Sequence, residues 1–361
     1  MILVSSLGEF DSSIFPLLYE FKENISQHII IHDDSKYESS KTLKFIAAQN
    51  EFKNFYDLNF ETKSIKVDED SYESLLDAFQ KIKVISNDKF ENVYFNGTGG
   101  LASTAVILSQ EILKRNGKFL AYDIFDNGFN IVSQNSLEKK QITKNQDIFT
   151  HLILKGYKLA SKGSKIDAFK RKNEVLQICE NIEKLKEFTT ALHGKKIDDI
   201  IGFERILNLL KSIDKLDDIS FIQGTIFEEY IYWLIEDNFD FDQVMFNVKI
   251  EFNENLFNEF DILMIKNNHL HTIECKLRNS IHGENTIYKI DSIIDYLDDD
   301  GKAMLLAVGG ENERITNTGT VKKQFTNGSL KRAENSNIKV HQSKFFDKQK
   351  FLDDVKSHFL N

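Results

Sequence analysis

Phe-Asp-Ile-Leu-Met-Ile at residues 260–265 and Thr-Ile-Glu-Cys-Lys-Leu at residues 272–277 decide how the last third of this chain folds. Both stretches are short and apolar, which predicts two neighbouring β-strands. Because side chains alternate along a strand, Glu274 and Lys276 point to one face, while the apolar residues around them point into a core. A carboxylate and an ammonium group therefore share one side of the sheet.

Asp261 would join them from the neighbouring strand. Two carboxylates and a lysine are costly to bury together unless a divalent cation is present. An ion held by Asp261 and Glu274 would lower the pKa of a bound water and stabilise a phosphoryl transition state. We therefore predict a nuclease that uses Mg²⁺ or Mn²⁺, in which Lys276 positions or deprotonates the water. A solvated Glu-x-Lys charge pair on an exposed strand remains the alternative.

A helical segment upstream, residues 224–235, offers a further acid. Glu228 shares its helical face with apolar residues three, four and seven positions later, whereas the face of Glu229 includes a second glutamate. We expect Glu228 to point inward and to support the catalytic site.

These residues carry a resemblance. The order of acidic helix, strand with Asp261, hairpin, strand with Glu-x-Lys and helix 288–293 resembles the PD-(D/E)xK, or restriction-endonuclease-like, nuclease core. More narrowly, it is similar to CRISPR-associated nucleases that join this core to an N-terminal CARF ligand-sensing domain. The proline of the motif name is absent, because Phe260 precedes Asp261.

Length and composition fit two domains. The chain has 361 residues, 41% hydrophobic content and 30 Phe, enough for two cores. We expect an α/β architecture with a Rossmann-like CARF domain over 1–145, a helical connector over 146–215 and a restriction-endonuclease-like domain over 216–361. Cys179 and Cys275 match no metal-ligand spacing, which favours a reducing cytoplasm and no structural zinc.

The first 135 residues alternate short apolar strands with helical patterns, which predicts a doubly wound sheet. No stretch of the chain has the length and apolarity of a membrane span. The segment 151–220 has helical periodicity throughout and is expected to be helical. The expected elements are strands at 2–4, 28–32, 93–95, 119–125 and 129–132, and helices at 36–52, 71–85 and 101–116.

Two loops that follow strands carry the chemistry of the N-terminal half. The first contains Ser5 and Ser6, and the second runs Asn96-Gly97-Thr98-Gly99-Gly100. In a doubly wound sheet such loops bind ligands, and glycines let backbone N–H groups approach phosphates. The second loop is neither a Walker A loop nor a dinucleotide fingerprint, and glycines that merely serve a tight turn are the alternative.

The CARF resemblance implies more. Asn96, Thr98, Gly99 and Gly100 match an Asn-x-Thr-Gly-Gly motif, and such domains form homodimers that bind cyclic oligoadenylate, here expected to be tetra-adenylate, across a two-fold axis. The sequence departs from the family at Leu101-Ala102, where Thr-Lys is often found, so a cation for phosphate is missing and the ring size is open. The resemblance implies a ligand-gated nuclease of type III CRISPR defence.

The chain is acidic as a whole, but one segment near its C-terminus is basic. The net charge of −10 opposes general adhesion to nucleic acid, so the nucleic-acid substrate must bind locally. Between residues 311 and 350, Lys and Arg outnumber Asp and Glu nine to four, and Lys322, Lys323, Lys331 and Arg332 either line a substrate groove or form a solvated loop. An ungated repair or recombination nuclease and a non-catalytic nucleotide sensor are the alternatives.

Overall fold

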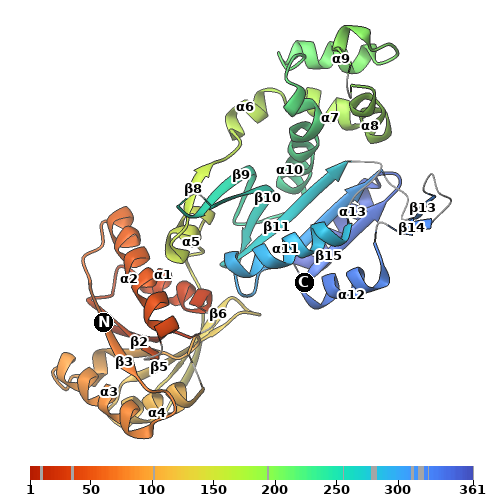
Figure 1. The fold of residues 1–361 in the computed structure, drawn as a ribbon. Coiled ribbons are helices and arrows are strands. Elements are labelled where there is room, and N and C mark those ends of the chain that lie inside the picture. The colour runs from red at the N-terminus through yellow and green to blue at the C-terminus, as the bar shows by residue number, and fades with distance from the viewer. Residues whose placement is uncertain are drawn as a thin grey trace. The chain divides into compact units, whose positions relative to one another are not determined.

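The chain forms two compact units, residues 1–158 and 159–361 (Figure 1). This computed structural model describes residues 1–8, 11–33, 36–100, 102–192, 195–254, 256–277, 283–309, 313–315, 321–323 and 325–360. Leu101 lies outside the described residues, as do the side chains of Lys322 and Lys323. No helix in these ranges is long and apolar enough to cross a membrane.

The first unit is a doubly wound α/β domain. Its strands are β1 (Ile2–Ser6), β2 (Gln27–Asp33), β3 (Glu61–Val67), β4 (Val93–Asn96), β5 (Lys118–Asp123), β6 (Gly128–Val132) and β7 (Leu137–Gln141). Its helices are η1 (Asp11–Ile14), α1 (Phe15–Phe21), α2 (Lys36–Tyr56), α3 (Tyr72–Ile85), η2 (Phe90–Asn92), α4 (Ala102–Leu113) and α5 (Ile148–Lys155). The sheet runs β3-β2-β1-β4-β5-β6-β7, and its strands are parallel from β3 to β5 and antiparallel from β5 to β7.

Helices cover both faces of this sheet. Leu3 packs in a core with α1, α2 and α5, whereas its neighbour Val4 packs in a second core with α3 and α4. The expected strands and helices are present. We missed both edge strands, β3 and β7, because β3 begins with four polar residues in ETKSIKV and all five residues of β7, LEKKQ, are exposed.

The chain reverses its winding direction beside β1, which lies between β2 and β4. The carboxyl ends of β1 and β4 therefore meet at the switch point of the sheet, where doubly wound domains bind ligands. Both loops singled out in the sequence follow these two strands.

The second unit contains a mixed sheet and a helical layer. Its helices are α6 (Lys165–Lys170), α7 (Lys172–Cys179), α8 (Ile182–Ala191), η3 (Ile197–Asp199), α9 (Glu204–Ser212), η4 (Phe221–Thr225), α10 (Ile226–Asn238), α11 (Gly283–Leu297), α12 (Asn327–Asn335) and α13 (Lys348–Phe359). Its strands are β8 (Lys158–Ser161), β9 (Gln243–Asn253), β10 (Leu256–Lys266), β11 (His269–Leu277), β12 (Ala303–Val308), β13 (Glu313–Ile315), β14 (Val321–Lys323) and β15 (Ile338–Ser343).

The main sheet of this unit runs β15-β12-β11-β10-β9-β8, and β13 pairs only with β14. The prediction that residues 151–220 are wholly helical is wrong, since β8 forms an edge strand that is largely exposed. Helices α7, α8 and α9 share one apolar core with α10, α13 and one face of the sheet. Most of the expected helical connector thus packs with the C-terminal unit, while α5 belongs to the first.

Candidate functional site

The β10–β11 hairpin positions the expected catalytic residues. The two strands are antiparallel, with Ile262 opposite Ile273, and both of these side chains are fully buried in the core. Asn267 and Asn268 form the turn with positive φ angles of 52° and 70°, a conformation that asparagine tolerates well. Because side chains alternate, Glu274 lies on the opposite face from Ile273.

The structure brings Asp261, Glu274 and Lys276 together. The Lys276 Nζ lies 2.7 Å from Glu274 Oε1 and 3.5 Å from Asp261 Oδ2. Asp261 Oδ2 also accepts a 2.7 Å hydrogen bond from the Cys275 backbone N–H. The three side chains are only 12–26% exposed, so the sheet holds two carboxylates and one ammonium largely away from water.

Glu228 of α10 also acts on this group. Burial, and then the charge of Asp261, raise the pKa of Glu228 to about 8. Burial, and then the charge of Glu274, raise the pKa of Asp261 to about 6. Each raised pKa means that another negative charge is disfavoured here, which is the electrostatic setting that a bound cation relieves.

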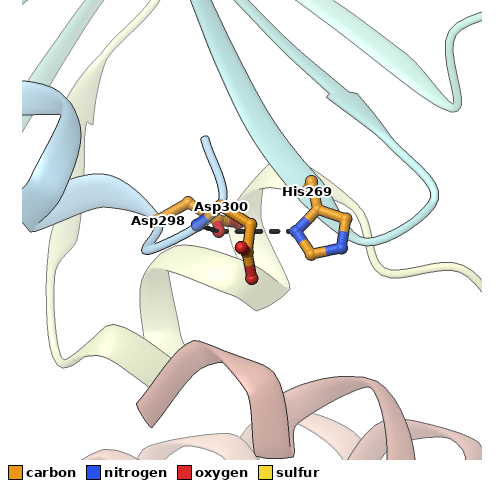
Figure 2. Close-up of side chains that lie close together, drawn as sticks. All are labelled: His269, Asp298 and Asp300. Atoms are coloured by element: carbon orange, nitrogen blue, oxygen red, sulfur yellow. Dashed lines mark hydrogen bonds and ion pairs between the residues drawn. The ribbon is translucent and has the colours of Figure 1, made fainter. Parts of the chain in front are cut away.

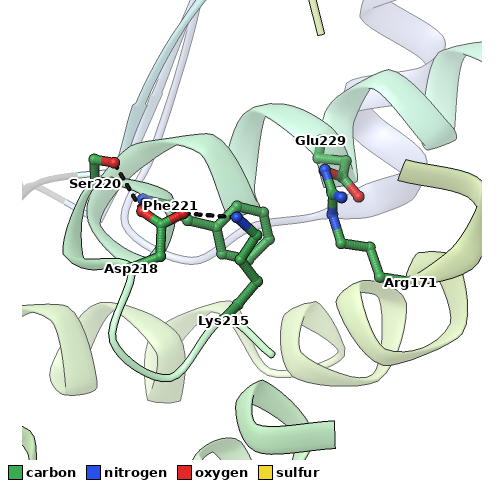
Figure 3. Close-up of polar contacts among 6 residues, drawn as sticks. All are labelled: Arg171, Lys215, Asp218, Ser220, Phe221 and Glu229. Carbon is green, nitrogen blue, oxygen red and sulfur yellow. Dashed lines mark hydrogen bonds and ion pairs between the residues drawn. The ribbon is translucent and has the colours of Figure 1, made fainter. Parts of the chain in front are cut away.

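The neighbouring acid, Glu229, is the more buried of the two. It is fully inaccessible to solvent, and its Oε2 accepts hydrogen bonds of 3.0 and 2.6 Å from Nε and Nη2 of Arg171 (Figure 3). The expectation that only Glu228 points inward is therefore wrong, because α10 is buried on nearly all sides. Glu229 joins α10 to Arg171, in the segment between α6 and α7, whereas Glu228 interacts electrostatically with Asp261 and Glu274.

A π-helical turn, η4, leads into α10 and shapes the surroundings of Glu228. Its start is held by Asp218, which accepts hydrogen bonds from Lys215 Nζ, Ser220 Oγ and the Phe221 N–H (Figure 3). A Cβ on Gly224 would lie 3.3 Å from Glu228 Oε1, so a glycine leaves room for that carboxylate. Such wide turns inside helices often occur at functional sites.

The donor set suits a hard divalent ion. Asp261 and Glu274 offer carboxylate oxygens, which Mg²⁺ and Mn²⁺ prefer, and the raised pKa values show that the site tolerates its negative charges poorly. Lys276 now lies between the two acids, so an ion would displace it from them. Burial opposes ionisation of Lys276, but Asp261 and Glu274 raise its pKa overall, so it is a cation. That charge favours the positioning role over proton abstraction.

A second group with potential ligand atoms was not foreseen. His269, Asp298 and Asp300 place one such atom each within 4.8 Å of one another, and no other group among the described residues does so (Figure 2). Asp298 accepts hydrogen bonds from the backbone N–H groups of Leu270 and Asp300, both at 2.9 Å. This buried aspartate therefore fastens the end of α11 to the start of β11, and a structural role accounts for it.

Sequence reasoning also missed Lys289, although it lies in the Tyr-Lys-Ile-Asp-Ser run that carried the resemblance. Its Nζ lies 3.8 Å from Glu274 Oε1, the oxygen that Lys276 also contacts. The spacing of buried Ile287, Ile290 and Ile294 fixes the face that α11 turns to the sheet. That periodicity was readable in the sequence, but the partner of Lys289 was not.

In the first unit, we expected Ser5 and Ser6 in the loop after β1, but both residues belong to β1 itself. Ser5 Oγ lies 2.9 Å from His28 Nε2, and the other ring nitrogen of His28 lies 2.8 Å from Gln49 Nε2. All three side chains are fully buried, and burial lowers the pKa of His28 to about 4. Ser5 thus holds a neutral polar network inside the core.

Ser6 faces the glycine loop. A Cβ on Gly100 would lie 1.8 Å from Ser6 Oγ, so only glycine fits there. Asn96 Oδ1 accepts hydrogen bonds from the N–H and the hydroxyl of Thr98, and the Thr98 hydroxyl accepts one from the Tyr122 N–H. Within the described chain, Ser6 Oγ and Asn96 Nδ2 are buried without a hydrogen-bond partner. The Ser6 hydroxyl and the Asn96 amide N–H groups can therefore hydrogen-bond to a ligand at the switch point.

The two loops touch, and a lysine reaches them. A Cβ on Gly8 would lie 2.4 Å from the Gly99 carbonyl oxygen, so the chains after β1 and β4 are in direct contact. The Lys41 Nζ of α2 donates a 2.5 Å hydrogen bond to the Gly8 carbonyl. Gly97 has a packing role instead, because its Cβ would lie 2.6 Å from the Phe119 ring.

Residues 215–344 match the family model described as "Card1-like, endonuclease domain". The Card1-like match contains Asp261, Glu274, Lys276 and Glu228, and it extends beyond the stretch that carried the resemblance in the sequence. This match confirms the prediction of a nuclease domain. A nuclease domain of this kind implies a requirement for a divalent metal. No curated protein sequence matches the chain significantly.

Solved structures extend the likeness to the whole chain. Can2 from Sulfobacillus thermosulfidooxidans, in complex with cyclic tetra-adenylate, is 17% identical, with a TM-score of 0.71 over 99% of this chain and 98% of that one. Protein VC1899 from Vibrio cholerae is 16% identical, with a TM-score of 0.72 over 99% and 96%. At such identities the comparison shows the fold, and it confirms the expected fold class.

A third structure is a type III CRISPR defence DNA nuclease activated by cyclic oligoadenylate. It is 9% identical and has a TM-score of 0.53 over 92% of this chain and 51% of that chain. The shared fold thus covers about half of that larger chain.

Proposed function

We propose that this protein is a divalent-metal-dependent nuclease that cyclic oligoadenylate activates, as an effector of type III CRISPR defence. The observation that carries the proposal is the convergence of Asp261, Glu274 and Lys276 inside the stretch that matches an endonuclease family. Structures of the same fold support the activation step, since one holds cyclic tetra-adenylate and another is a nuclease activated by cyclic oligoadenylate.

In this proposal Asp261 and Glu274 hold Mg²⁺ or Mn²⁺, and Glu228 supports the site. When bound, the ion would supply an activated water and an electrophile for the phosphate. Lys276 orients the attacking water and stabilises negative charge that develops on the phosphoryl group. Burial of the acids strengthens these interactions, because charges act more strongly where water is excluded.

The activator would bind at the carboxyl ends of β1 and β4. Ser6 Oγ, Asn96 Nδ2 and the backbone of Gly99 and Gly100 supply polar contacts, and Lys41 supplies the cation that the loop sequence lacks. A two-fold symmetric ring needs two copies of the site, so the working form is a homodimer in the cytoplasm. To move the active state from one to ninety-nine per cent, the ligand must favour it by about 5.5 kcal/mol.

Cleavage assays test this proposal directly. RNA, single-stranded DNA and duplex DNA are each incubated with Mg²⁺, Mn²⁺ or EDTA, with and without cyclic tetra-adenylate and rings of other sizes. We expect cleavage only with metal and an activating ring, and none by Asp261→Asn or Glu274→Gln. Full cleavage without any ring would refute activation by cyclic oligoadenylate and show a constitutively active nuclease. Full cleavage in EDTA would refute the metal site.

Binding and assembly give separate readings. Calorimetry should show one ring per dimer for wild type and for Lys276→Ala, and weaker binding for Lys41→Ala. Light scattering should give a dimer at micromolar concentration. A monomer both with and without ring would refute the symmetric site.

A further inference from the structure

Two lysines contact one oxygen of Glu274. Lys276 Nζ lies 2.7 Å from Glu274 Oε1, and Lys289 Nζ approaches the same atom at 3.8 Å from a different element, α11. Their surroundings differ: the Lys276 side chain is 26% exposed and is also bonded to Asp261 and to the Cys275 carbonyl, whereas Lys289 is 49% exposed. Of the two cations, Lys289 is therefore the more accessible to incoming substrate.

The charge balance shows what Lys289 adds. Glu228, Asp261 and Glu274 contribute −3 when ionised, Lys276 contributes +1, and a divalent ion would contribute +2, so these groups sum to 0. Lys289 would make the metal-loaded site one unit more positive, which favours the singly negative phosphodiester. A site of net positive charge attracts this substrate, whereas the chain as a whole, at −10, repels it.

A purely structural role explains Lys289 poorly. An ion pair at 3.8 Å with a half-exposed lysine contributes little to stability, because solvent screens it and the long side chain loses freedom. The fold holds α11 by other means, since Ile287, Ile290 and Ile294 of the helix are buried. Removal of the Lys289 ammonium should therefore leave folding unchanged.

We propose that Lys289 is a substrate-binding residue of the nuclease site, whose ammonium leaves Glu274 and binds a non-bridging oxygen of the scissile phosphodiester. This inference rests on the proposed nuclease function. A divalent ion on Glu274 would weaken the hold of that carboxylate on both lysines. The exposed side chain of Lys289 is then free to turn toward the substrate, while Lys276 keeps its contact with the Cys275 carbonyl.

The test measures binding separately from cleavage. Short fluorescein-labelled RNA and DNA oligonucleotides are titrated with the protein in the presence of cyclic tetra-adenylate and of Ca²⁺ as a slowly reacting metal. Fluorescence anisotropy is read over a range of salt concentrations. The variants are Lys289→Ala and Lys289→Arg. The matched control is Lys356→Ala, which removes an exposed lysine of α13.

We expect Lys289→Ala to bind about tenfold more weakly, and its slope of log affinity against log salt to fall by about 0.7–0.9, the value for one lost phosphate contact. Lys289→Arg should restore most of the affinity and the slope, and Lys356→Ala should match wild type. In Mg²⁺ or Mn²⁺, Lys289→Ala should lower kcat/KM by a factor of about 10²–10³. All variants should melt at the wild-type temperature.

Lys289→Ala with wild-type affinity and salt slope would overturn this inference alone, provided that wild type cleaves. A Lys289→Ala variant that melts well below wild type, and that Lys289→Arg does not rescue in binding, would assign the residue a structural role and also overturn it. Failure of wild type to bind or cleave any of the polymers would overturn the proposed function as well.

Discussion

Replacement of Glu228 by glutamine should stabilise the metal-free protein at high pH. Burial and the charge of Asp261 raise the pKa of Glu228 from 4.5 to about 8 in the folded state. A carboxyl group with a raised pKa contributes stability that is fully present below about pH 4.5 and is lost as pH rises through 8. Glutamine does not ionise, so Glu228→Gln avoids that loss.

The size of the effect follows from the same pKa. A difference of 3.5 (8 − 4.5) at about 1.36 kcal/mol per pH unit gives an upper limit of about 5 kcal/mol. Water entry and the coupled protonation of Asp261 reduce this, and we expect about 2 kcal/mol at about pH 9 and under 1 kcal/mol at about pH 5. For a unit of about 200 residues, 2 kcal/mol corresponds to roughly 4–8 °C in Tm.

Trp233 provides the assay. It is the single tryptophan of the sequence and lies buried on α10, one helical turn beyond Glu229, so its fluorescence reports unfolding of the C-terminal unit. Wild type, Glu228→Gln and the exposed control Glu334→Gln are unfolded in urea with EDTA at both pH values. If the free energy of unfolding differs between wild type and Glu228→Gln by the same amount at the two pH values, the reasoning is refuted. Added Mn²⁺ should stabilise wild type more than the variant.

Three further changes probe the supports of the two sites. Arg171→Ala leaves the buried carboxylate of α10 without its partner and should cost about 3–5 kcal/mol in urea unfolding, with partial recovery in Arg171→Lys. Gly224→Ala should push the Glu228 carboxylate aside, so calorimetry should show weaker Mn²⁺ binding with an unchanged melting temperature. Gly100→Ala should abolish binding of cyclic tetra-adenylate in calorimetry, because the new Cβ would lie 1.8 Å from Ser6 Oγ; wild-type affinity in this variant would exclude the clash.

The sequence alone determined the features that depend on local alternation. Period-two patterns placed Glu274 and Lys276 on one face of a strand and predicted the hairpin that brings Asp261 beside them. Alternating strands and helices, with glycines after β4, identified a doubly wound domain and its loop. The polar edge strands β3, β7 and β8 were not predicted, because none of them has an apolar run.

The tertiary structure decided which side chains meet. Helix α10 is apolar on nearly all sides, so periodicity could not tell which glutamate reaches the acids and which binds Arg171. The burial of Ser5 against His28 and the reach of Lys41 to Gly8 join residues more than 20 positions apart. Lys289 meets Glu274 only because α11 packs beside β11. Contacts between distant elements depend on how their faces pack, and no local pattern in the sequence records that packing.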